Sequence, residues 1–177
     1  EPVSFESGPV RPLALSPDGS SLAAVNIPDG YVELFAVAPG ELDHIVSIPV
    51  GLEPVAVLWR DAASLFVVNH LSDTVSVVDI NAQSVVNTLH VGDEPRDAVV
   101  AANRLFVSAA HRGQQRTHPS VAAVPGGGDS ELTTPGGPRA DIWVFEANAD
   151  SDIPVESVNL FGDTPRALAV SPDGAVV

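Results

Sequence analysis

Three arginines occupy corresponding places in a repeated phrase of the sequence. Arg11, Arg96 and Arg166 each stand at the start of a short apolar run, close after a Gly and a Pro. A guanidinium offers a planar fork of donors that matches carboxylates and phosphates, so three around one opening predict a small anionic ligand. The alternative is ion pairing within this acid-rich chain. The nearby acids are Glu94, Asp97 and Asp163.

Histidines offer a second kind of chemistry, because neutral imidazole is the commonest metal-binding side chain. His70 follows Asn69 at the end of an apolar run, and we take these two as candidate ligand-binding residues. His111 and His118 lie seven positions apart in a segment without strand pattern and form a candidate metal pair. Solvated loop histidines are the alternative, and the sequence predicts no cofactor.

Catalytic chemistry finds little support in the residue types. Cys and Met are absent, which excludes disulfides, a thiolate nucleophile and copper–thiolate sites. Ser16 and Asp18 belong to a Ser-Pro-Asp-Gly phrase that recurs at 171–174. Turn chemistry accounts for this phrase, since Pro presets φ and Gly takes the positive-φ position. No motif joins a nucleophile to a base and an orienting acid, so we predict no catalytic residue.

Charge narrows the range of partners. The chain of 177 residues carries 23 acids against 8 basic residues, all arginine, and has a net charge of -15. Such a surface repels phosphate backbones, which argues against nucleic acid as a general partner. No apolar stretch reaches the ~18 residues that cross a bilayer, so membrane insertion is not expected. The remaining candidates are a protein or a small anionic ligand.

A repeat of about 40 residues organises the chain. The phrase Gly, two or three residues, Pro and an apolar run begins at Gly8, Gly51, Gly92 and Gly162, with intervals of 43, 41 and 70 residues. The last interval contains an insertion at 111–139, rich in Gly, Pro, Ser and Thr, a composition typical of a functional or flexible loop. The predicted units are the end of a preceding blade at 1–7, blades at 8–50, 51–91 and 92–161, and the start of another blade at 162–177.

Each repeat carries the pattern of four short strands. We expect them at 13–15, 22–26, 31–35 and 44–50, then at 54–59, 64–69, 74–79 and 85–91. The third repeat has its second strand at 105–108 and its third at 141–145. A four-stranded unit of this length is one blade of a β-propeller. We predict an all-β propeller of four-stranded antiparallel blades, about 3.5 of them present.

In such blades the last-to-first connections and the second-to-third-strand loops open on one face. This places the Gly-x-x-Pro segments, Asn69, His70 and the insertion together, and we expect function on this loop-rich face. The ring needs the remainder of the propeller, or a second copy, to close.

Phe66-Val-Val-Asn69, Asp73-Thr-Val-Ser-Val-Val-Asp79 and Val91-Gly-Asp-Glu-Pro, with the Ser-Pro-Asp-Gly turns, resemble the YVTN family of β-propeller repeats. The resemblance implies a seven-bladed extracytoplasmic protein of the periplasm, the cell surface or the secreted fraction. It implies a non-catalytic binding or interaction role on the loop-rich face. Two alternatives stay open: the propeller part of a redox or hydrolytic enzyme with its catalytic residues outside this segment, and a structural surface-layer module.

Overall fold

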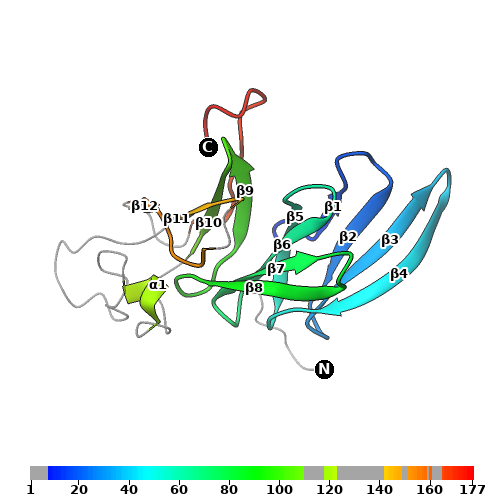
Figure 1. Cartoon of the computed structure of the whole chain (residues 1–177), viewed down its shortest axis with the longest axis horizontal. Coiled ribbons are helices and arrows are strands. Elements are labelled where there is room, and N and C mark those ends of the chain that lie inside the picture. The colour runs from blue at the N-terminus through cyan, green and yellow to red at the C-terminus, as the bar shows by residue number, and fades with distance from the viewer. Residues whose placement is uncertain (1–7, 110–117, 123–141, 149–150, 159, 161–164) are drawn as a thin grey trace.

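The computed structural model describes residues 8–109, 118–122, 142–148, 151–158, 160 and 165–177, and these form three four-stranded antiparallel sheets (Figure 1). In every sheet the strands lie side by side in chain order. The first sheet contains β1 (Leu13–Leu15), β2 (Ser21–Asn26), β3 (Tyr31–Ala38) and β4 (Glu41–Pro49). The second contains β5 (Pro54–Trp59), β6 (Ser64–Asn69), β7 (Thr74–Asp79) and β8 (Ser84–His90). The third contains β9 (Asp97–Ala101), β10 (Arg104–Ser108), β11 (Ile142–Glu146) and β12 (Glu156–Val158).

The predicted all-β class with four-stranded antiparallel blades is therefore confirmed. Strands β1, β5, β6 and β7 have the predicted bounds, because alternating or continuous apolar runs mark them clearly. Strand β4 begins at Glu41, earlier than predicted. Gly40 adopts a left-handed backbone, φ 79°, which closes a tight turn and lets pairing continue to the hairpin tip.

The second blade is buried on both of its faces. One apolar cluster joins blades one and two, and another joins blades two and three. Strand β5 lies against both β1 and β9, and a parallel bridge links Arg11 to Ala56 at the inner edge. This double contact explains the nearly continuous apolar run of β5, whose residues 54–58 are all buried.

The Ser-Pro-Asp-Gly phrase forms the predicted turn in both of its copies. The Ser16 hydroxyl donates to the Asp18 carboxylate at 2.6 Å, and Ser171 donates to Asp173 at the same distance. The glycines that follow, Gly19 and Gly174, have φ of 76° and 70°. Turn geometry thus accounts for all these side chains.

Several expectations fall on parts of the chain outside the described residues. The preceding-blade strand at 1–7 and most of the insertion at 111–139 belong to them. The insertion contributes one described element that the sequence did not predict, the short helix α1 (Pro119–Ala122). Residues 165–177, expected to begin another blade, contain the turn but no assigned strand. Within the described part of the chain, no helix is long and apolar enough to cross a membrane.

Candidate functional site

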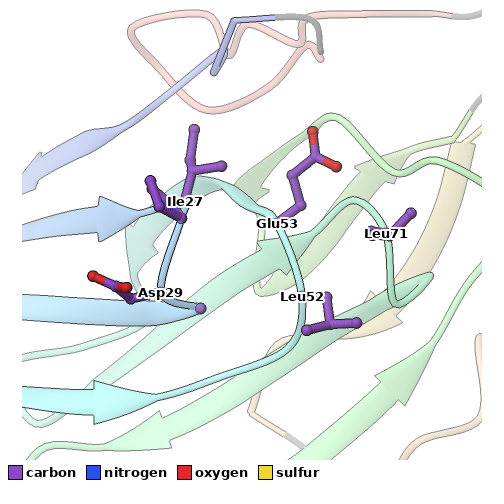
Figure 2. A pocket seen from close by; sticks show the side chains of 7 residues that line it. Ile27, Asp29, Leu52, Glu53 and Leu71 are labelled. Atoms are coloured by element: carbon purple, nitrogen blue, oxygen red, sulfur yellow. The ribbon is translucent and has the colours of Figure 1, made fainter. Parts of the chain in front are cut away.

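Three connections between strands line a pocket of about 340 Å³ on the loop-rich face of blades one and two (Figure 2). They are the β2–β3 turn, the β4–β5 connection and the β6–β7 turn. The lining residues are Ile27, Pro28, Asp29, Gly30, Leu52, Glu53 and Leu71. Last-to-first and second-to-third connections therefore meet on one face, as predicted. The pocket combines apolar side chains with two carboxylates.

Backbone hydrogen bonds hold the β4–β5 connection against the β6–β7 turn. The Leu71 N–H donates to the Leu52 carbonyl at 3.2 Å, and the His70 N–H donates to the Glu53 carbonyl at 2.9 Å. The Leu52 N–H donates to Ser72 Oγ at 2.6 Å. Glu53 has a left-handed backbone, φ 55°, which is unfavourable for a residue with a Cβ and is maintained by this frame. The pocket wall is therefore pre-formed.

Asn69 secures the base of this connection from inside blade two. Its Nδ2 donates to Thr74 Oγ1 at 3.1 Å and to Ser76 Oγ at 2.9 Å, and the side chain is fully buried. A Cβ on Gly51 would lie 2.6 Å from Asn69 Cγ, so only glycine fits there. Close packing on Asn69 thus explains the glycine of the second repeat, Gly51. The structure places Asn69 in this contact, below the pocket lining.

His70 connects blade two to the next Gly-x-x-Pro segment. Its Nδ1–H donates to the Pro95 carbonyl at 3.2 Å, and its ring is buried. The neighbouring Asp73 accepts from the Glu94 N–H at 2.9 Å. Burial raises the pKa of Asp73 to about 6, and the charges of Asp93 and Glu94 add to this effect. The β6–β7 turn is therefore fastened to blade three as well.

Each arginine of the predicted group has a partner within the described residues. Arg11 forms a two-point ion pair with the fully buried Asp97, with Nε to Oδ1 at 3.0 Å and a terminal nitrogen to Oδ2 at 3.2 Å. Arg96 pairs with Glu94 at 3.2 Å. Arg166 donates to the Gly8 carbonyl at 3.2 Å. Ion pairing, the alternative weighed from the sequence, is what the structure shows for Arg11 and Arg96.

A second hollow, of about 230 Å³, follows the inner strands beside Arg11. Its lining is mainly apolar and comes from β5, β9 and the last described segment. The lining residues are Arg11, Leu58, Trp59, Ala98, Val99, Val100 and Val170. Because Asp97 occupies the guanidinium fork of Arg11, this hollow offers an anion less charge than the sequence suggested.

Only one residue of the predicted metal pair, His118, lies among the described residues. His111 lies outside the described residues, whereas His118 stacks on His90 with ring centroids 3.8 Å apart. Among residues whose placement is described, no group of three or more acids and histidines could hold a metal ion. The metal role of His111 and His118 stays a prediction.

One polar cluster superficially resembles a hydrolase triad. His44 Nε2 lies 2.9 Å from Glu33 Oε2 and 3.2 Å from Ser47 Oγ, and Ser47 also bonds to Glu33. A triad needs the acid and the nucleophile on different nitrogens of the imidazole, but here both contact Nε2. Burial acts to raise the pKa of Glu33, yet hydrogen bonds from Asn26, Ser47 and His44 lower it. The cluster holds a carboxylate between strands and shows no catalytic arrangement.

Sequence reasoning missed Asp29, Leu52, Glu53 and Leu71, the residues that shape the pocket. One signal was present in the repeat. The position after the Gly-x-x-Pro proline is Arg in the third and fourth repeats but Val55 in the second. Glu94 has Arg96 as its partner two residues later, whereas Glu53 has no arginine there. This exceptional repeat contributes Leu52, Glu53 and Leu71 to the pocket.

Comparison with solved structures supports the fold. A hydrazine synthase chain from Kuenenia stuttgartiensis matches with a TM-score of 0.69 and 22% identity, over 98% of this chain and 44% of that one. A functionally unknown protein from Desulfotomaculum acetoxidans matches with a TM-score of 0.51 and 16% identity, over 56% of this chain and 34% of that one. This chain thus spans less than half of either neighbour. No protein-family model matches it, and a search of curated proteins found no match.

Proposed function

We propose that this chain is part of a non-catalytic, extracytoplasmic interaction propeller that binds its partner on the loop-rich face. The observation that carries the proposal is the pocket framed by the β2–β3, β4–β5 and β6–β7 connections. Leu52 and Leu71 in its wall are 61% and 65% exposed although hydrogen bonds fix their backbones. Rigid, exposed apolar side chains around a hollow are typical of an interaction site.

The residue chemistry supports binding over catalysis. The pocket contains carboxylates and aliphatic groups but no nucleophile paired with a base. The extracytoplasmic location is supported by the resemblance of the repeats to surface and periplasmic propellers. The likeness to a hydrazine synthase chain concerns the fold, because identity is 22%. An enzyme whose reacting groups lie outside residues 1–177 is therefore the competing proposal.

The test is protein-observed NMR of the intact protein against a library of short peptides and small organic ions. We expect bound compounds to shift amide signals of residues 27–30, 51–53 and 70–72. The double variant Leu52→Ser, Leu71→Ser should lose these shifts, while Val86→Ser, an exposed change on β8, should keep them. Hits that map elsewhere, or turnover of a compound by the protein, would overturn the interaction role.

A further inference from the structure

The pocket contains a carboxylate that has no counterion among the described residues. Glu53 and Glu94 occupy the same place in successive Gly-x-x-Pro segments and share a left-handed backbone, with φ of 55° and 49°. Glu94 is neutralised by Arg96 at 3.2 Å. For Glu53, no ion pair or side-chain hydrogen bond occurs among the described residues. One repeat thus satisfies its glutamate internally, and the other presents it to the pocket.

A second carboxylate and a set of apolar groups share this pocket. Asp29 comes from the β2–β3 turn, where Asn26 Nδ2 donates to it at 3.1 Å and orients it. Leu52 lies beside Glu53, and Leu71 of the β6–β7 turn lines the same pocket (Figure 2). A ligand that fits must therefore carry positive charge together with aliphatic surface.

Long basic side chains combine these two properties. Arginine and lysine bury an aliphatic stem while they keep a charged head group at a polar position. A guanidinium also matches a carboxylate through two parallel hydrogen bonds. The net charge of -15 would draw such a segment toward the surface as a whole.

We propose that the pocket binds an arginine side chain, flanked by an apolar residue, on an extended segment of a partner protein. This inference rests on the interaction role proposed above. The guanidinium lies at Glu53, and the flanking apolar side chain lies on Leu52 and Leu71. This cationic ligand differs from the anionic ligand that the arginines suggested from the sequence. The guanidinium of Arg11 already has a carboxylate partner within the protein, Asp97.

The test uses two synthetic peptides, acetyl-Ala-Leu-Arg-Leu-Ala-amide and the same peptide with citrulline, which keeps the shape of arginine without its charge. We expect the intact protein to bind the arginine peptide about tenfold more tightly than the citrulline peptide. Glu53→Gln should remove that preference. Glu94→Gln, at the matching place in the next repeat, should preserve it, and raised salt should weaken it.

The outcomes separate this inference from the proposed function. Equal binding of both peptides at residues 51–53 and 70–72 would overturn the arginine assignment and leave the interaction site intact. Binding of neither peptide would likewise overturn the assignment. Shifts confined to residues outside the pocket would overturn both proposals. Circular dichroism of Glu53→Gln and Glu94→Gln establishes that each variant is folded.

Discussion

Arg11 and Asp97, 86 residues apart, form a two-point ion pair that joins the first blade to the third. The Asp97 carboxylate also accepts from the N–H groups of Ala98 and Leu168, each at 2.9 Å. Arg11 in turn donates to the Leu168 carbonyl at 3.2 Å. One buried carboxylate thus connects three repeats near the inner strands. It binds Arg11, an arginine that the sequence had suggested as a ligand-binding residue.

Replacement of Asp97 by asparagine should lower the free energy of unfolding by about 2–4 kcal/mol, since the buried carboxylate loses its charge in the pair with Arg11 and its hydrogen bonds are weakened. Urea denaturation measures this change. Glu94→Gln is the control, because it removes a more exposed pair with Arg96 and should change stability by less than ~1 kcal/mol. Equal effects of the two variants would contradict a central role for the Asp97 contact.

Gly51 is the glycine for which the structure demands the absence of a Cβ. Gly51→Ala would place a carbon 2.6 Å from Asn69 Cγ and 2.7 Å from Asn69 Cβ, so blade two or the β4–β5 connection must move. We expect a loss of about 1–3 kcal/mol in thermal or urea unfolding. Gly8→Ala is the matched control in the first repeat, where a Cβ meets no atom within 4 Å. A stable Gly51→Ala variant would disprove the packing argument.

Asp73 should make stability depend on pH in the mildly acidic range. Its usual pKa of 3.8 is raised by burial to about 6, so the folded protein binds a proton more tightly than the unfolded chain does. Stability from this group is therefore full below about pH 4 and decreases as pH rises through about 6. Asp73→Asn should flatten the stability profile between these values and stabilise the protein at pH 7, by up to about 3 kcal/mol.

Unfolding curves measured at several pH values check this prediction. Asp93 and Glu94 contribute to the raised pKa of Asp73, so Glu94→Gln should shift its titration downward without abolishing it. Asp18 serves as a contrast at lower pH. Hydrogen bonds from Ser16 and Ser20 lower its pKa to about 2, and its contribution is lost only as pH falls from about 4 toward 2. A flat profile between pH 4 and 7 in the native protein would contradict the Asp73 assignment.

Local patterns predicted the blades because each blade is built from nearby residues. The strands of the second repeat pair within about 40 residues of one another, and their apolar runs report burial directly. The Ser-Pro-Asp-Gly turn was predicted for the same reason, since its hydrogen bonds link Ser16 to Asp18.

The site was harder to predict, because it depends on contacts between repeats. The sequence around Arg11 does not indicate that its partner is Asp97 and not Glu94 or Asp163. Arg11 and Asp97 come together only because the blades stack. Glu53 belongs to a pocket whose other residues come from positions 27–30 and 71. The sequence does show Val55 where the next repeat has an arginine. This substitution indicates an unpaired glutamate only when it is compared with the Glu94–Arg96 pair of the structure.

The outer face of blade one should drive association of the 177-residue chain when it is expressed alone. Leu13 and Leu15, paired with Ala24 and Leu22, are 57% and 56% exposed. Their counterparts in blade two, Val57 and Trp59, pair with Val67 and Leu65 and pack against blade one. Repeat symmetry thus identifies the Leu13 side of blade one as a blade-packing surface.

The variant Leu13→Ser, Leu15→Ser should weaken this association more than about tenfold, because each leucine contributes roughly 1.5–3 kcal/mol when it is buried. Sedimentation velocity over a range of concentrations measures the change. Val86→Ser on the outer strand β8 removes a side chain of similar exposure, 58%, and should have little effect. If both variants associate as the native chain does, the contact surface lies elsewhere, and Leu13 does not pack between molecules as Val57 packs between blades.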